Sequence, residues 1–174
     1  MASNTRTTKL ESINTMLSTI GEAPVNSLTG TLPTDATMAI NILDEVNREV
    51  QSQGWKFNSS YKVTLTRDTN NKIPIGNDVM HIEFNHLREN RSSYDPVLRG
   101  SFLYNLVDES FVWDKNFDNV RVIFLIPFED AIEQARRFIT IRASRIFHDR
   151  TLGANALHRF SQQDELRALS FLKQ

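Results

Sequence analysis

The sequence contains no cysteine and no long apolar run, and its first residues lack the apolar stretch of a secretory signal. The absence of cysteine excludes disulfides, thiolate zinc sites, iron–sulfur clusters and cysteine nucleophiles. The longest strongly apolar run, residues 120–126, is interrupted by Arg121 and is too short to span a bilayer. We therefore expect a soluble protein that is not exported.

The sequence also lacks an excess of charge of either sign. The chain of 174 residues has 20 Lys and Arg against 21 Asp and Glu, a formal net charge of -1. This balance argues against a protein dedicated to binding polyanions. What the chain does have is 40% hydrophobic residues, including 11 phenylalanines. That content suffices for one domain, or for two small lobes that share a core.

Helical patterns begin the sequence. Thr8 and Glu11 form a capping-box pair in front of an apolar repeat, which predicts a helix over residues 8–20. Gly21 supplies the left-handed residue that ends it, and Pro24 follows. Residue 34 or 35 then caps a second helix, whose apolar stripe continues until Gly54.

Helical patterns also close the sequence. Pro127 is expected in the first turn of a third helix, which is acidic at its start, rich in arginine later and ends near Gly153. A weaker apolar repeat predicts a fourth, C-terminal helix.

Between the helical segments, apolar and polar residues alternate, so the period of the apolar pattern is two residues. Trp55 and Phe57 begin a series of strand candidates, which continue at 61–65, 79–84, 102–107 and 120–126. The intervening segments 68–72, 85–99 and 114–119 have loop composition. We therefore expect an α+β fold: a discontinuous helical bundle of residues 1–60 and 127–174, with a small antiparallel β domain inserted at 61–126.

The second helix has two sides that favour burial. Met38 and Ile42 lie four residues apart and point away from its main apolar stripe. Either a second subunit covers this side or another helix of the same chain does; the pattern leaves both open.

The arginines of the third helix allow two interpretations. Arg142 and Arg145 share a face and are suited to bind phosphates along a nucleic-acid path. Alternatively they pair, within or between subunits, with the acidic residues Asp44, Glu45 and Glu49 of the second helix. We favour pairing, because charged helix residues usually form surface or interface ion pairs.

The sequence offers little catalytic chemistry. His81, Glu83 and His86 lack the convergence of a zinc site, and we expect no metal, cofactor or catalytic residue. The glycines are scattered singly and no nucleophile elbow occurs. Glycan hydrolysis needs a pair of carboxylates, and nothing in the spacing of the loop acids selects one. These acids include Asp108, Glu109, Asp114 and Asp118.

Two blocks stand out by their length and order. The first comprises Ile20-Gly21-Glu22, Pro24-Val25, Ala36, Ala39, Ile42-Leu43, Asn47-Arg48, Gln51-Ser52, Gly54-Trp55 and Phe57-Asn58. The second comprises Arg136, Ile139, Arg142-Ala143-Ser144-Arg145, Phe147, Arg150 and Gly153-Ala154. In these blocks the chain resembles the tail tubular protein A family, the head-to-tail adaptors of T7-like short-tailed phages. The motif is explicable structurally, since Gly21 and Gly54 end helices and Trp55 and Phe57 are expected to anchor the first strand to the helices.

The resemblance implies a structural virion protein of the tail or neck, assembled in the host cytoplasm and without enzymatic activity. It implies a dodecameric ring between the portal protein and a tail nozzle resembling tubular protein B, with genomic DNA passing through the lumen. We expect the helical domain to form the ring. We expect the C-terminal helix and its flank to meet the portal and the β loops to meet the nozzle, or the reverse. The expected subunit interface comprises Met38, Ile42, Asp44, Glu45, Glu49, Arg142 and Arg145.

The near-neutral charge fits a conduit, because many phosphate contacts repeated around a ring would oppose the exit of DNA. We expect an acidic or mixed lumen. Two alternatives remain: an adaptor that also hydrolyses glycans, and a DNA-binding protein that uses the arginines of the third helix.

Overall fold

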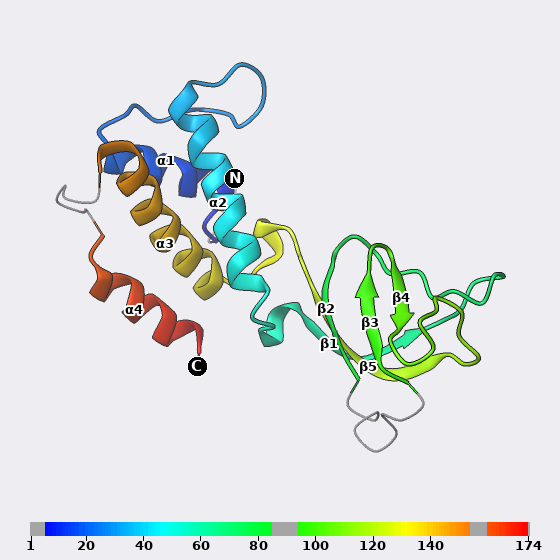
Figure 1. Ribbon diagram of the computed structural model, residues 1–174. Coiled ribbons are helices and arrows are strands. Elements are labelled where there is room, and N and C mark those ends of the chain that lie inside the picture. Colours follow the sequence, from blue (N-terminus) through cyan, green and yellow to red (C-terminus); the bar gives the residue numbers. More distant parts are fainter. Residues whose placement is uncertain (1–5, 85–93, 154–159, 174) are drawn as a thin grey trace. The chain divides into compact units, whose positions relative to one another are not determined.

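The computed structural model describes residues 6–84, 94–153 and 160–173 (Figure 1). The chain forms two compact units. The helical unit comprises Met1–Val50 and Pro127–Gln174, and the β unit comprises Gln51–Ile126. The α+β class expected from the sequence is confirmed.

The helices of the described chain are α1 (Lys9–Thr19), α2 (Thr34–Gln51), α3 (Glu133–Leu152) and α4 (Gln162–Leu172). Local capping explains the start of α1. Thr8 accepts a hydrogen bond from the backbone N–H of Glu11, and the Glu11 carboxylate accepts one from the N–H of Thr8. Gly21, with a φ of 81°, follows α1 as expected.

The predicted start of α3 is wrong. Pro127 precedes a short 3-10 turn, Phe128–Asp130, and α3 begins only at Glu133. Between them Ala131 and Ile132 are extended. The burial of Phe128 and Ala131 gives the physical reason, because tertiary packing there outweighs the preference of Pro127 for a first helical turn. The predicted end of α3 at Gly153 is confirmed.

The core of the helical unit is built from both small and large apolar residues. Ile13, Met16 and Leu17 of α1 are almost completely buried, and α1 packs against α3. Burial of side chains of this size stabilises the fold by about 1.5–3 kcal/mol each. Ala39 and Ala143 have no exposed surface, so α2 and α3 each carry a small residue where the core is crowded.

The described residues of the β unit form two small antiparallel sheets. One has the strand order β1-β5-β2, and the other pairs β3 with β4. The strands are β1 (Ser59–Leu65), β2 (Val79–Glu83), β3 (Pro96–Arg99), β4 (Phe102–Asn105) and β5 (Phe117–Phe124).

Three predictions within the β unit are wrong. The segment around Trp55 and Phe57 is not a strand but leads into a 3-10 turn, Lys56–Asn58. β3 lies inside the segment 85–99 that was expected to be a loop; the rest of that segment, up to residue 93, lies outside the described residues. β5 begins at Phe117, three residues earlier than expected, because Phe117 pairs with Leu65 and is buried.

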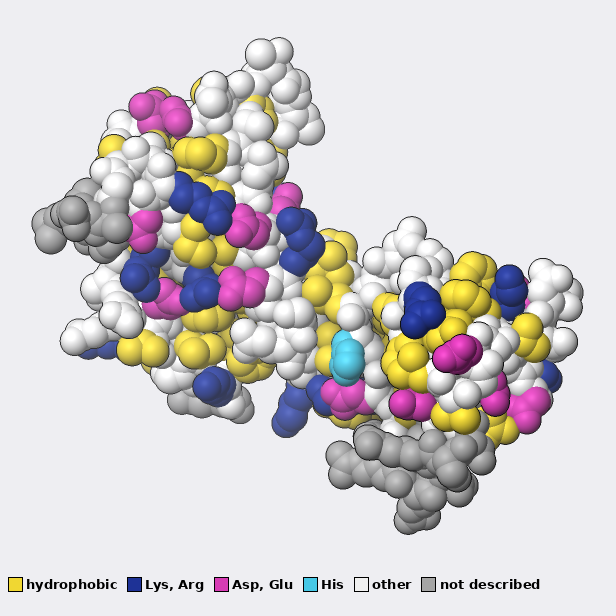
Figure 2. Space-filling view, viewed as in Figure 1, with side chains coloured by type: hydrophobic (Ala, Val, Ile, Leu, Met, Phe, Trp, Pro, Cys, Tyr) yellow, Lys and Arg dark blue, Asp and Glu magenta, His cyan; other side chains and the backbone are white. Residues whose placement is uncertain are grey.

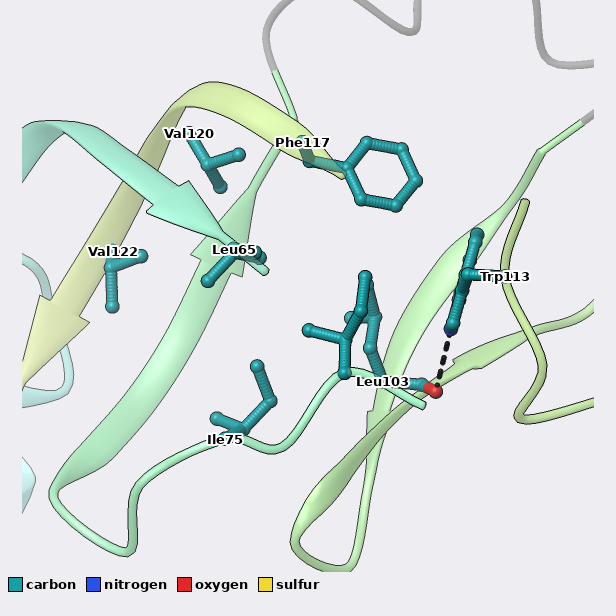
Figure 3. Packing of buried hydrophobic residues seen from close by; sticks show 8 residues of the cluster. Leu65, Ile75, Leu103, Trp113, Phe117, Val120 and Val122 are labelled. Atoms are coloured by element: carbon teal, nitrogen blue, oxygen red, sulfur yellow. Dashed lines mark hydrogen bonds between the residues drawn. The ribbon is translucent and has the colours of Figure 1, made fainter. Parts of the chain in front are cut away.

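The core of the β unit lies between the two sheets and their loops (Figure 3). Trp113 is 2% exposed, and its indole N–H donates a hydrogen bond to the carbonyl of Leu103 at 3.0 Å. The ring of Phe117 meets that of Trp113 edge to face, with centroids 5.0 Å apart. Leu65, Ile75 and the other valine and leucine side chains drawn complete a single apolar cluster.

The β unit begins at Gln51, ten residues before the expected boundary. The Gln51 side chain donates to the carbonyl of Ile126 and accepts from its N–H, both at 2.9 Å. The buried Asn58 amide donates to the carbonyls of Gln51 and Phe124. These contacts join the first and last residues of the unit and explain why residues 51–60 belong to it.

Candidate assembly surfaces

Ion pairs cover one face of the helical unit. Arg142 of α3 contacts Glu49 of α2 at 2.7 Å and Glu165 of α4 at 2.6 Å. Arg145 also pairs with Glu165. In Figure 2 basic and acidic side chains alternate on the face of the helical unit that is turned to the viewer. These side chains hold α2, α3 and α4 together through charge.

The members of this network differ in exposure. The Glu165 side chain is 13% exposed, whereas Glu45 and its partner Arg150 are 52% and 49% exposed. The hydrogen bond with Glu49, followed by that with Glu165, raises the pKa of Arg142. The hydrogen bond with Arg150 lowers the pKa of Glu45. Because solvent screens exposed pairs, the contacts of Glu165 contribute more stability than that between Glu45 and Arg150.

The structure thus brings most of the expected interface charges together inside one chain. Glu49, Arg142 and Arg145 belong to one network, and Glu45 pairs with Arg150. Asp44 pairs instead with Lys9 of α1 at 2.6 Å. The partner of Arg145, Glu165, was missed, because no sequence signal placed α4 beside α3.

Met38 and Ile42 behave differently from each other. Ile42 is 2% exposed, so its own helical unit already covers it. Of the two alternatives for this side of α2, coverage by the same chain therefore applies to Ile42. Met38 is only half-buried and keeps surface for another contact.

The motif arginine Arg136 has a structural role. It is 2% exposed and donates to the carbonyls of Ala131 and Thr7 at 2.9 and 2.8 Å, and also to that of Glu129. One guanidinium therefore fixes both the chain before α1 and the turn before α3. Planar, always-charged donors suit such a position.

The remaining motif residues also serve the fold. Gly54 and Gly153 have φ values of 73° and 88°, which explains glycine at both. Asn47 is buried, whereas Arg48 and Pro24 are exposed. Trp55 and Phe57 are half-buried in the segment that enters β1.

Exposed apolar side chains mark surfaces that favour contact with other molecules. On α4, Leu166 and Phe171 are 58% and 57% exposed. On the β unit, Val107 and Val112 are 45% and 55% exposed.

A hollow of about 540 Å³ opens on the β unit. It brings together two of the acids considered for glycan hydrolysis, Asp108 and Asp114, beside Arg67. Asp108 accepts a hydrogen bond from Asn105 at 2.7 Å, and Asp114 accepts one from Tyr94 at 2.8 Å. The contact with Asp114 also raises the pKa of Tyr94, which keeps the phenol protonated as a donor. Both carboxylates are thereby accounted for as structural acceptors.

The other two acids do not line this hollow. Glu109 is exposed in the loop after β4, and Asp118 accepts from Thr64 across the β1-β5 pair at 2.8 Å. Among the described residues no group of three or more metal-ligating side chains occurs, and Glu83 is engaged by Arg121. His86 lies outside the described residues. Within the same described parts, no helix has the length and apolarity needed to cross a membrane.

A family model described as Tail tubular protein matches residues 10–174. The chain belongs to the tail tubular protein family. The match includes nearly all of both units, so the resemblance seen in the sequence is confirmed. No curated protein matches the chain.

This tail tubular protein is accordingly a structural component of a phage virion and part of its tail. Three arginines of its α3, Arg142, Arg145 and Arg150, form ion pairs with acidic residues inside the chain. Its exposed apolar residues, by contrast, have surface left for assembly.

Proposed function

We propose that this tail tubular protein is the adaptor that joins the portal to the tail nozzle, as a ring whose lumen forms part of the DNA ejection conduit. Membership of the family over residues 10–174 supports a tail role. The existence of two compact units supports an adaptor, because such a protein needs distinct surfaces for distinct neighbours. By the resemblance, the ring is a dodecamer assembled in the host cytoplasm.

The observation that carries this proposal is the pairing of Arg142, Arg145 and Arg150 of α3 with carboxylates within the chain. A guanidinium that already has a carboxylate partner neutralises DNA phosphates poorly. Few counterions are then released from the DNA, so the guanidinium binds DNA weakly. This favours a passive conduit over a DNA-binding protein.

A ring requires two different complementary surfaces on each subunit. We place Met38 in one of them, since it is half-buried in the isolated chain. The side chains of Glu49 and Arg142 remain 49% and 33% exposed and are suited to contact the neighbouring subunit beside Met38. We retain α4 as the portal side and the β-unit loops as the nozzle side.

The deciding experiment measures mass with and without the portal. The purified chain is expected to be monomeric alone and to form a portal-matched ring when the portal of the same phage is added. Cryo-electron microscopy of virions should then place it at the neck. A protein that stays monomeric with portal, and is absent from the neck, would refute the proposal.

Two further assays separate the alternatives. Electrophoretic shifts of duplex DNA are expected to be absent at physiological salt; a persistent shift would favour the DNA-binding protein. The purified chain is expected to release no sugar from host polysaccharides. If it does, Asp108→Asn and Asp114→Asn test the hollow, with Asp118→Asn as a control outside it.

A further inference from the structure

A groove of about 300 Å³ lies between α3 and α4. Arg137 and Ile141 of α3 are one turn apart on one wall. On α4 the lining positions recur at helical spacing, so one side of that helix forms the other wall. The lining residues are Arg137, Ile141, Phe160, Asp164, Arg167, Ala168 and Phe171.

The groove has an apolar floor with an exposed aromatic ring. Ile141 and Ala168 are each 4% exposed, so they form a closed surface. Phe171 is 57% exposed although it lines the same groove. An aromatic ring left in water beside a buried apolar floor is suited to receive an apolar side chain from a partner.

The charges at the rim are unbalanced. In the described parts of the chain, neither Arg137 nor Arg167 has an ion-pair partner, unlike Arg142 of the neighbouring network. Asp164 also lines the groove, and it accepts hydrogen bonds from the N–H and hydroxyl of Ser161, the N-cap residue of α4. These bonds, and then the two arginines, lower the pKa of Asp164.

We propose that this groove binds a segment of a neighbouring virion protein that carries an apolar anchor flanked by carboxylates. The anchor packs on Phe171 and Ile141, and the carboxylates pair with Arg137 and Arg167. Guanidinium groups favour carboxylates because two parallel N–H bonds fit one carboxylate. A nucleic acid is disfavoured here, because the lining residues of the groove include only two cations and also the acid Asp164. The inference rests on the proposed function, in which α4 faces the portal.

Photocrosslinking identifies the occupant directly. Phe171 is replaced by p-benzoylphenylalanine, a conservative change at an exposed site, and assembled virions are irradiated. The expected product joins position 171 to a protein other than this chain, within four residues of an aspartate or glutamate. A product formed only with another copy, with DNA or with a segment lacking acids overturns the inference, as does the absence of any product from particles that contain the protein.

Charge reversal tests the rim independently. Two synthetic helical peptides serve as probes, one with a phenylalanine flanked by glutamates and one with lysines in those places. The full chain should bind only the acidic peptide, and Arg137→Glu with Arg167→Glu should weaken it by at least about tenfold. Lys62→Glu, on β1 in the other unit, is the matched control and should leave binding unchanged.

Equal binding of the two peptides, or no effect of the double reversal, contradicts the proposed chemistry. The two proposals fail separately. A chain that forms the portal-matched ring but fails both groove tests retains the adaptor function and loses only this inference.

Discussion

Replacing Gly54 with alanine should destabilise the β unit more than the same replacement at Gly100. Both residues have positive φ, 73° and 62°. A Cβ at Gly100 would meet no atom within 4 Å. A Cβ at Gly54 would lie 2.4 Å from Cδ1 of Ile123 and 3.2 Å from a guanidinium nitrogen of Arg121. Comparison of the Gly54→Ala and Gly100→Ala variants therefore separates the cost of backbone strain from that of steric overlap.

The magnitudes follow from these two terms. A left-handed alanine costs about 1–2 kcal/mol. Reduced freedom of the unfolded chain offsets about 0.4–1 kcal/mol of that cost. Gly100→Ala should then cost about 1 kcal/mol. Ile123 is 3% exposed and has little room to move, so Gly54→Ala adds an overpacking cost of about 1–3 kcal/mol.

Urea unfolding followed by tryptophan fluorescence measures both variants. The two tryptophans, Trp55 and Trp113, lie in the β unit, so the signal reports its unfolding. With an m value of about 1–2 kcal/mol/M, the midpoint should fall by about 1–4 M for Gly54→Ala and by about 0.5–1 M for Gly100→Ala.

A double-mutant cycle provides the control. Ile123→Val removes the Cδ1 methyl that the new Cβ at position 54 would meet, so the double variant should be more stable than the sum of the single costs predicts. Equal midpoints for the two alanine variants, or strictly additive costs in the cycle, would refute the reasoning.

The other predictions concern the helical unit. Glu165→Gln should increase hydrogen exchange in α4 and lower its stability by about 1–2 kcal/mol, because two arginines lose a shared partner, whereas Glu45→Gln at an exposed pair should change little. Arg136→Met leaves three backbone carbonyls without their donor and should lower the thermal unfolding temperature, with a cost of about 2–4 kcal/mol in denaturant titrations. The folded pKa of Glu11 lies below its usual 4.5, and that of Glu45 is lowered too, so their stabilisation is complete above that pH and is lost as pH falls through the lowered values. Circular dichroism melts should show a decline below about pH 4.5 that Glu11→Gln makes shallower.

Local signals in the sequence predicted the ends of several elements. The capping box of Thr8 and Glu11 fixes the start of α1, and Gly153 fixes the end of α3, because both act through the backbone within one turn. The pairing of α3 arginines with the acids of α2 was also predictable, since residue type and helical spacing suffice to propose it.

The remaining features could not be predicted, because they depend on tertiary contacts. The start of α3 depends on buried Phe128 and on Arg136, which holds the preceding turn from inside the helix. β3 follows a polar segment and begins with a proline, both features of loops. The contacts of Glu165 and the exposure of Phe171 depend on where α4 lies, which no periodic pattern specifies.

The hydrogen bonds between Gln51 and Ile126 have a consequence for how such chains diversify. They bring the entry and exit of the β unit within one side chain of each other. The chain therefore leaves the helical unit and returns to it through two neighbouring positions, 51 and 126. Any module put in place of residues 52–125 would therefore need two ends that lie as close together as Gln51 and Ile126.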